Sequence, residues 1–596
     1  MQEVNSPQGQ QTAFDRLKVH CRGTFLFDME TFSEYVTKNH CDCLCRLLAK
    51  ERIKQGAQNK LGTRDSESMI RSLMPCRNEW IRLRKSTRVK DISKEALSIL
   101  TIRKTIAADR RRILTSPSPS LGYLSKLDQY TSEISDIAAG RSAVAFSRKD
   151  YTIIPKFKGD EGHDAIYRPL CVYNNLDTKI LISAASAYFT QCFDAYLHEE
   201  ILSYRPRRMY HGVKTTTSGN DAIRCIKQYL EEHRGQNIYV AECDIQKFFD
   251  IINHDVVLDC FDRLAQKAGI PDYHQVRNIL EAYLDSYGFV PDVFELNNTL
   301  SFWAMPAKKH RGAVKGKFMF KWVKEEDFLE AYTKEEFAEV RDRLGVPQGG
   351  ALSCVISNVV LNDVDQAIIQ EEDTDRLFIR YGDDIILMHT DKEKCEGLLE
   401  RYKQSLVDHK LIYHKFEDFS NLKTEEKITK AFWKGKSKPV FFWGPGEGNA
   451  SEWIGFVGYE INYQGATRLR LSTLDKKFGD INKKYHRCLE SREASPEKLV
   501  ARAKTIIASL PSSIKKFTEL DTEAAANPHL VRQLRSLDAY RYKKLRKLDQ
   551  KLSKRCPEDV NLTEHFRADE KSSFYRAKFE KRSFRLEDDM WVYFGA

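Results

Sequence analysis

Long apolar runs are scarce in this chain of 596 residues. No stretch reaches the roughly 20 consecutive apolar residues that a membrane-spanning helix needs. The polar start, residues 1–11, also lacks the apolar core of a secretory signal. Internal repeats and low-complexity tracts are not apparent either, which argues against a repeat protein. These absences predict a cytoplasmic protein without a membrane partner.

Paired cysteine spacing is missing as well. The 14 cysteines are scattered, and none forms a Cys-x-x-Cys pair. The trio Cys41, Cys43 and Cys45 lies next to His40, but its spacing is not that of a zinc site. Free thiols in a reducing compartment are the simplest interpretation, and they argue against a disulfide framework.

Positive charge exceeds negative charge by a modest margin. Lys and Arg number 96 against 85 Asp and Glu, a formal net charge of +11, which suits a polyanionic partner. Two segments concentrate the excess: residues 77–112 carry 12 basic and 4 acidic residues, and residues 532–555 carry 10 and 2. Aromatic residues lie nearby at Trp80, Tyr540 and Tyr542. Such segments fit tracking of a nucleic acid backbone, although a solvated helix face has the same composition.

Four residues, Tyr381-Gly382-Asp383-Asp384, separate two apolar runs, 376–380 and 385–388. Alternating β-branched and aromatic residues predict strands, and Gly382 permits the turn between them. The pattern therefore predicts a tight β-hairpin with two carboxylates at its tip. Because adjacent carboxylates repel, they favour a cation beside them, and Mg²⁺ binds carboxylate and phosphate oxygens. Asp and Gly are also common in hairpin turns that have no chemical role.

A third carboxylate follows a second strand-like run. Residues 238–243 favour a strand, and Asp244 ends it. If this strand pairs with the hairpin, Asp244 faces Asp383 and Asp384. Three carboxylates could then hold two metal ions roughly 4 Å apart for in-line phosphoryl transfer. Mg²⁺ is the expected ion, and Mn²⁺ is the alternative.

Three motifs in this order resemble the palm of reverse transcriptases. They are Asp244 with Phe248-Phe249-Asp250 and Asn253-His254, then Gly345-Val-Pro347-Gln348-Gly349-Gly350 with Ser353 and Asn358, then Tyr381–Asp384. The resemblance implies catalytic and metal-binding roles for Asp244, Asp383 and Asp384. It also implies that the backbone carbonyl of Ile245 is a metal ligand.

The resemblance extends over about residues 150–475. In the bacterial members a Lys and an Arg of the fingers embrace the incoming triphosphate, and the matching positions here are Lys156 and Arg168. Gln348 and Gly349 are implied to contact the dNTP. A lysine near the pyrophosphate is expected within residues 410–430, where the match is loose and both Lys415 and Lys423 are candidates.

Two further sets of contacts with nucleic acid are expected. Residues 453–461 resemble the primer-grip hairpin, which implies a role for Gly458, and Tyr381 begins the metal-binding turn. Basic residues near the end of the chain are the other set, namely Arg541, Lys543 and Lys544.

Phe249 bears on the choice between DNA and RNA as the product. RNA-dependent RNA polymerases also contain a Gly-Asp-Asp hairpin, so they are the rival interpretation. In reverse transcriptases a bulky aromatic residue five positions after the first Asp lies under the sugar and excludes a 2′-hydroxyl, whereas RNA polymerases tend to have a polar residue there. Phe249 occupies this position, and we therefore predict dNTP selection with Phe249 as the steric gate.

The predicted fold class is α+β, a right-hand polymerase with a small antiparallel sheet in its palm. Residues 1–120 are predicted to form a basic helical extension, residues 121–235 the fingers, and residues 476–596 a helical, thumb-like domain. The palm, 236–475, would contain an insertion near 285–340 and the primer-grip hairpin at 453–470. The clearest predicted helices of the C-terminal region are Leu499 to Leu510 and Leu530 to Leu552, and Ser93 to Leu114 also carries apolar residues at helical spacing.

Nothing in the tail resembles an RNase H domain, and no nuclease or integrase segment is apparent. This layout is most similar to the abortive-infection and other defence-associated bacterial reverse transcriptases. The resemblance implies RNA-directed DNA synthesis against phage, an RNA template that is in some cases non-coding, unconventional priming and a homo-oligomer. A retron-like or intron-like enzyme with a dedicated RNA stays open, as does a silent nucleic-acid-binding scaffold. The three intact carboxylates argue against the scaffold.

Overall fold

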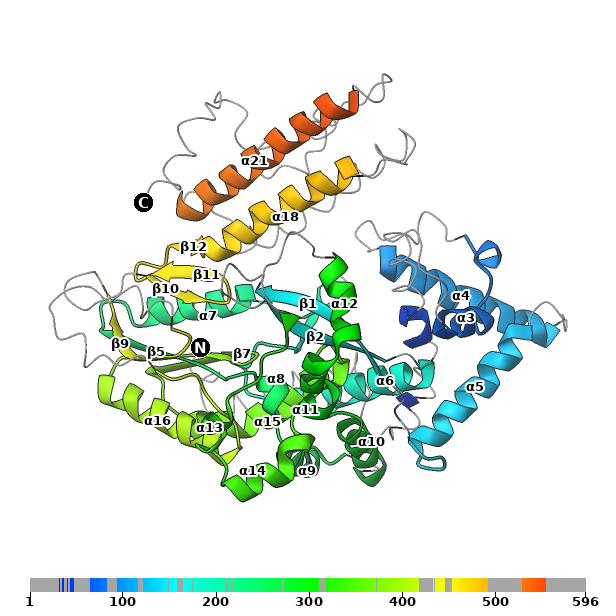
Figure 1. The fold of residues 1–596 in the computed structure, drawn as a ribbon, viewed down its shortest axis with the longest axis horizontal. Helices are drawn as coiled ribbons and strands as arrows, with labels where there is room; N and C mark the ends of the chain where they lie inside the picture. Colours follow the sequence, from blue (N-terminus) through cyan, green and yellow to red (C-terminus); the bar gives the residue numbers. More distant parts are fainter. Residues whose placement is uncertain are drawn as a thin grey trace, which may run out of the picture.

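Figure 1 shows the protein as a computed structural model. The structure describes residues 32, 35–36, 40, 43–47, 65–82, 94–115, 122–144, 146, 149–157, 165–173, 175–210, 213–216, 219–270, 273–309, 318–370, 372–416, 432, 435–444, 453–490 and 528–553. The predicted α+β fold of a right-hand polymerase is confirmed in this part of the chain.

A four-stranded antiparallel sheet forms the palm, with the strand order β7-β8-β5-β9. The strands are β5 (Ile238–Asp244), β7 (Arg376–Tyr381), β8 (Asp384–His389) and β9 (Lys438–Trp443). Their inner positions are mostly β-branched or aromatic, which suits a pleated and buried surface. Residues 377–380 of β7 and 385–389 of β8 are buried, and packing therefore fixes the two strands that lead to the hairpin.

Alternate residues of β8 face two different hydrophobic cores. Ile385 and Leu387 pack with helices α15 (Ala351–Ile369) and α16 (Lys392–Asp408), whereas Ile386 and Met388 pack with α7 (Gly219–Glu232). A period of two is the geometry of a strand, and it shows here that the sheet is covered on both faces.

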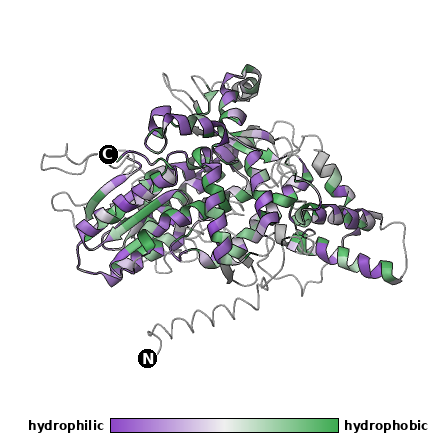
Figure 2. Cartoon of the chain, turned by 90° about the horizontal axis from the view of Figure 1, so that it is seen from below, coloured by the Kyte–Doolittle hydropathy of each residue, from purple (hydrophilic) through white to green (hydrophobic). Residues whose placement is uncertain are grey.

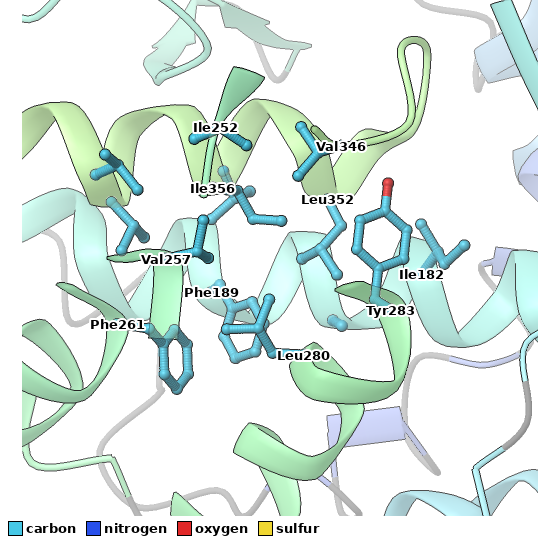
Figure 3. Close-up of a cluster of buried hydrophobic side chains, with 14 of the residues drawn as sticks. Ile182, Phe189, Ile252, Val257, Phe261, Leu280, Tyr283, Val346, Leu352 and Ile356 are labelled. Carbon is cyan, nitrogen blue, oxygen red and sulfur yellow. The ribbon is translucent and has the colours of Figure 1, made fainter. Parts of the chain in front are cut away.

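The larger core lies among four helices, whose centre is drawn in Figure 3. They are α6 (Leu176–Phe193), α9 (His254–Ala268), α10 (Tyr273–Asp285) and α15. Phe189 and Phe261 meet edge to face with their ring centroids 5.1 Å apart, a favourable arrangement for aromatic pairs. Tyr283 is completely buried, and its hydroxyl lies 2.8 Å from Oγ of Ser353 on α15. This core supports the loop that precedes α15.

Helix α15 corrects one expectation from the sequence. Its 19 residues are long and apolar enough to span a bilayer by length and composition alone, although no such stretch was expected. However, 72% of the apolar window is buried inside the protein. Its apolarity is therefore that of a core helix. Figure 2 shows the same distribution more widely, with green on the inner strands and purple on the outer sides of the surrounding helices.

The fingers contain a three-stranded sheet of order β1-β2-β6. Strands β1 (Lys149–Phe157) and β2 (Ala165–Tyr173) are antiparallel, and β6 (Phe318–Met319) pairs with β2 in parallel. Strand β6 belongs to the segment where an insertion is predicted. The segment's other elements are α11 (Phe289–Asp292), η5 (Phe294–Asn298), α12 (Leu300–Lys309), α13 (Glu325–Phe328), α14 (Lys334–Val340) and η6 (Arg341–Arg343). It is therefore attached to the fingers by main-chain hydrogen bonds.

Helices dominate both flanks of the core. Before the fingers lie α3 (Asp65–Ser72), η1 (Arg77–Glu79), α4 (Lys94–Thr115) and α5 (Gly122–Ala138). After the palm lie the strands β10 (Trp453–Phe456), β11 (Tyr459–Asn462) and β12 (Thr467–Leu469), then helices α18 (Leu471–Glu490) and α21 (Pro528–Ser553), which pack side by side (Figure 1). The remaining described elements are η4 (Asp194–Tyr196), β3 (Pro206–Tyr210), β4 (Val213–Thr216) and α8 (Phe248–Ile251). Helices α4 and α21 confirm the helices predicted at Ser93 to Leu114 and Leu530 to Leu552, whereas the helix predicted at Leu499 to Leu510 lies outside the described residues.

Candidate active site

The predicted hairpin is present. Strands β7 and β8 pair up to Tyr381 and Asp384, which leaves Gly382 and Asp383 as the turn. Gly382 has φ +75°, a conformation that glycine adopts without steric cost. The turn therefore projects the carboxylates of Asp383 and Asp384 from the end of a rigid ribbon.

Asp244 lies beside this turn. It is the last residue of β5, and its Cα partner across the ladder is Asp384. The Asp244 side chain is nearly buried, whereas Asp384 is exposed. The pairing of β5 with β8 thus brings together two carboxylates, Asp244 and Asp384, that are 140 residues apart in the sequence.

The two carboxyl groups of the turn are perturbed by their surroundings. Desolvation raises the pKa of Asp383, and the nearby Asp244 raises it further. Desolvation, followed by the charges of Asp244 and Asp383, raises the pKa of Asp384 to about 7. Like charges in one site disfavour ionisation of all of them, and a bound cation would relieve this cost.

A lysine and a histidine already lie beside the carboxylate of Asp244. The ammonium of Lys436 forms an ion pair with Oδ2 of Asp244, and Nε2 of His414 lies 3.6 Å from the same oxygen. The backbone N–H of His414 donates to the Asp244 carbonyl at 2.9 Å. The sequence analysis did not identify Lys436 or His414. Lys436 lies two positions before Lys438, which pairs with Glu242 of β5, so the pairing of β9 with β5 brings Lys436 near Asp244.

Of the two candidates for the pyrophosphate lysine, Lys415 lies 3.9 Å from Asp327 on α13, and Lys423 lies outside the described residues. Among the lysines that the structure describes, Lys436 forms an ion pair with the carboxylate cluster.

The donor set fits a divalent metal ion. All three side chains offer carboxylate oxygens, the ligands that Mg²⁺ and Mn²⁺ prefer. The cluster already attracts the ammonium of Lys436. Ile245 follows Asp244 directly, and the role of its carbonyl as a metal ligand stays a prediction.

A loop before α15 joins two of the sequence motifs. The backbone N–H of Val346 donates to the carbonyl of Phe249 at 2.8 Å. The side-chain amide of Gln348 donates to Oδ1 of the buried Asp250 at 2.5 Å. The dNTP candidates Phe249 and Gln348 are therefore held in fixed positions relative to each other.

The same loop also contacts the fingers. The N–H of Cys171 on β2 donates to the Gln348 carbonyl at 2.9 Å. Gly349 has φ +91°, and a Cβ at this position would lie 2.3 Å from Cδ1 of Leu170. A larger residue at position 349 would force the loop away from β2. Glycine is thus required here both by conformation and by the close approach of two segments.

The two fingers candidates lie on paired strands. Arg168 is exposed on β2, and its positive charge opposes the rise in the pKa of Asp383. Lys156 lies in β1 at an irregularity of the β1–β2 register between Pro155 and Phe157, and its side chain is outside the described residues. The structure therefore brings Arg168 toward the carboxylates and leaves the role of Lys156 a prediction.

Phe249 is half-buried on α8, next to the fully buried Phe248. Its carbonyl anchors the Gln348 loop, as described above, and the next residue, Asp250, holds Gln348 itself. This position suits a residue whose ring meets the sugar, and the gate role stays a prediction.

One predicted nucleic-acid contact is wrong. Arg541 is part of α21 and is only 1% exposed, so its guanidinium is not available at the surface. Leu534, Leu537, Leu545 and Leu548 are buried on the same helix. Their spacing of three and four residues includes position 541, and Arg541 therefore belongs to the packed face of the helix.

The other nucleic-acid candidates have different surroundings. Lys543 is exposed on α21. The ammonium of Lys544 donates to Asn482 of α18 at 2.6 Å and lies 4.9 Å from the Tyr485 ring centroid. Gly458 forms the β10–β11 turn with φ +88°, and Tyr381 is half-buried at the end of β7.

Comparison with known proteins identifies the central segment. The sequence pattern of the family described as "Reverse transcriptase (RNA-dependent DNA polymerase)" matches residues 302–420. This range includes Gln348, Asp383 and Asp384 but not Asp244. No curated protein matches the chain.

Two solved structures show a weak likeness to this chain. A Candida albicans telomerase in complex with a TWJ fragment of telomeric RNA is 12% identical, with a TM-score of 0.32, and the match covers 84% of this chain and 81% of that one. An apo telomerase from Candida tropicalis is 12% identical, with a TM-score of 0.36, and the match covers 87% and 75%. The family match and the hairpin geometry carry the assignment: the chain contains a reverse transcriptase domain, the domain of RNA-directed DNA polymerases.

Proposed function

We propose that this protein copies RNA into DNA by adding dNTPs in a reaction that depends on two Mg²⁺ ions. The observation that carries the proposal is the ladder register that sets Asp244 opposite Asp384, beside Asp383. These three residues would hold the ions. When bound, divalent cations activate a primer 3′-hydroxyl and stabilise the leaving pyrophosphate.

The remaining residues bind and orient the substrates. Arg168 donates charge-assisted hydrogen bonds to the triphosphate from the fingers. Gln348, held by Asp250, orients the nucleotide against the ring of Phe249. That ring excludes a 2′-hydroxyl, so the enzyme selects dNTPs. Lys436 pairs with Asp244, one of the residues that would hold the ions, and its ammonium would bind the phosphates of the dNTP from there.

The test is primer extension on an RNA template with labelled dNTPs or rNTPs and Mg²⁺. The wild type is expected to incorporate dNTPs, and the Asp383→Ala, Asp384→Ala double variant is expected to lose activity by at least about 10³-fold. Asp391→Ala, an exposed cap of α16, is the matched acidic control and should retain activity. Equal incorporation by the double variant would refute the proposal.

We further propose that this polymerase acts in the cytoplasm in defence against phage. The support is the similarity in layout to defence-associated reverse transcriptases, a central polymerase with helical parts on both flanks. Expression of the wild type should reduce phage plaque formation, and the Asp383→Ala, Asp384→Ala variant should not. Equal plating on both strains would remove the defence role and leave the polymerase intact.

The last part of the proposal concerns how DNA synthesis starts. A tyrosine hydroxyl of the C-terminal region, for example that of Tyr540 or Tyr542, would start DNA synthesis in place of an ordinary primer. DNA that remains attached to protein through phenol extraction would support this mode, and free DNA would exclude it. Copurification of one abundant structured RNA would instead favour the retron-like or intron-like alternative.

A further inference from the structure

A buried ion pair lies directly beneath the catalytic hairpin. Arg380 is the residue before Tyr381, and both its side chain and that of Asp365 on α15 are 0% exposed. Nε of Arg380 donates to Oδ2 of Asp365 at 2.7 Å. A charged pair removed completely from water joins strand β7 to the main core helix.

The guanidinium of Arg380 also reaches the turn itself. Its Nη1 lies 3.1 Å from Oδ1 of Asn358 on α15 and 3.4 Å from the carbonyl oxygen of Gly382. Asn358 in turn donates to the carbonyl of Ser203 at 3.0 Å. The Arg380 side chain therefore connects α15 with the turn that carries Asp383, and Asn358 extends this network to Ser203.

The backbone of Arg380 is fixed as well. Its N–H donates to the Glu200 carbonyl at 3.2 Å, and its carbonyl accepts from the N–H of Leu202 at 3.0 Å. In contrast, a Cβ built on Gly382 would meet no heavy atom within 4 Å. The turn thus has open space on its outer side, and its support comes from beneath.

Stability alone does not account for this arrangement. Burying an ion pair costs more free energy than a well-packed apolar pair unless every polar atom is satisfied. Among the residues that the structure describes, Nη2 of Arg380 and Oδ1 of Asp365 have no hydrogen-bond partner. An incompletely satisfied network in the core is a cost to the fold, so the pair requires another explanation.

We propose that Arg380 is a positioning residue that, with Asp365 and Asn358, holds the Gly382 turn so that Asp383 and Asp384 stay opposite Asp244. The inference rests on the proposed polymerase function. Arg380 does not touch the substrate, because it is buried behind the carboxylates. Its effect is therefore on the rate of the chemical step and on metal affinity, and not on nucleotide affinity.

The test replaces the pair by apolar residues of similar size, Arg380→Met with Asp365→Leu. This double variant removes both charges together, so the fold should keep a thermal midpoint close to that of the wild type. We expect kcat for single-nucleotide incorporation to fall by about 10²-fold, the loss that a displacement of about 1 Å can cause. The KM for dNTP should stay within about threefold.

Metal binding provides a second readout that needs no activity. Mn²⁺ titration followed by electron paramagnetic resonance should show weaker binding to the double variant than to the wild type. If the wild type incorporates no nucleotide, the proposed function fails, and this titration alone decides the positioning role. Arg263→Met is the control, because Arg263 also pairs with an aspartate of α15, Asp363, but 57% of its side chain is exposed. In this variant, kcat and Mn²⁺ affinity should both stay at the wild-type level.

Arg380→Lys keeps the test decisive if the double variant does not fold. Lysine can pair with Asp365, but it lacks the fork that also reaches Asn358 and Gly382. We expect this variant to fold, with a lowered kcat and weaker Mn²⁺ binding. A folded double variant with kcat and Mn²⁺ affinity within threefold of the wild type, or wild-type values in Arg380→Lys, would overturn the proposal.

Discussion

The tip of the catalytic hairpin is built from charged side chains, whereas the helical core behind it is built mainly from buried apolar side chains. At the tip, Asp244, Asp383 and Asp384 crowd like charges together, and the pKa of Asp384 rises to about 7. In the core, Phe189, Phe261 and their neighbours are buried apolar groups, and the Tyr283 hydroxyl is paired. The comparison indicates that chemistry is carried by an edge of crowded carboxylates and that stability is carried by the packed helices. Apolar residues of the helical core that do not contact the hairpin can therefore be altered with little effect on the chemistry.

The largest expected effect on stability is in the core. Phe261→Ala should lower the free energy of unfolding of the palm by about 3–5 kcal/mol, because it leaves a cavity against Phe189. Incorporation per folded molecule should change by less than about twofold. Denaturant titration and active-site-normalised rates would measure both. Leu114→Ala, at a position that is 85% exposed, is the control, and an equal loss of stability there would break the comparison.

Phe249 lies at the boundary of the two regions. Removal of its ring by Phe249→Ala should reduce discrimination against ribonucleotides by about 10–200-fold, the range for one apolar contact in a pocket. The ratio of kcat/KM for dNTP and rNTP measures this effect. Phe248→Leu, at the buried neighbour, should cost stability and leave the ratio unchanged. An unchanged ratio in Phe249→Ala would remove the gate.

His254 makes the stability of the core depend on pH. Burial lowers its pKa to about 4, and its ring N–H donates to the Gly345 carbonyl at 2.7 Å. In the unfolded chain, His254 takes up a proton with a pKa of about 6.5, whereas in the folded chain it stays neutral down to about pH 4. The free energy of unfolding therefore decreases as the pH falls from about 6.5 toward 4. Between pH 7 and 5, the wild type should lose about 2 kcal/mol more than His254→Gln does. Parallel pH profiles of the two proteins in denaturant titrations would contradict this account.

The smallest expected effect is at Tyr283. Tyr283→Phe removes the hydroxyl that pairs with Ser353 and should cost about 1 kcal/mol, the net contribution of one buried hydrogen bond. Thermal unfolding would measure the loss. Since Ser353 also donates to the Pro347 carbonyl at 2.7 Å, Ser353→Ala should cost more. The reverse order would show that the tyrosine hydroxyl, and not the loop contact, supports this part of the core.

Local patterns predicted much of the catalytic edge. Alternation of apolar residues predicted the strands, the Gly382 turn predicted the hairpin, and the resemblance to the reverse transcriptase palm implied that β5 lies beside it. Arg541 was misassigned because its charge was given more weight than its position. The buried leucines at 534, 537, 545 and 548 share a helical period with residue 541, and that period was readable in the sequence.

The contacts beneath and beside the hairpin could not be predicted in the same way. The Arg380–Asp365 pair depends on how α15 is oriented against β7, which the periodicity of neither segment reveals. Lys436 reaches Asp244 because β9 pairs with β5 on the side opposite β8. Strand order is set by packing between elements far apart in the chain, so sequence spacing alone does not contain it.

The central claim is that Asp244 and the hairpin carboxylates form one metal-dependent site. The most direct measurement is single-nucleotide incorporation by Asp244→Asn, which keeps the side-chain shape and removes the charge. The account predicts a loss of at least about 10³-fold, since bound metal contributes several kcal/mol to the transition state, with no loss of folding stability. Incorporation within tenfold of the wild type, while the Asp383→Ala, Asp384→Ala variant is inactive, would contradict the account.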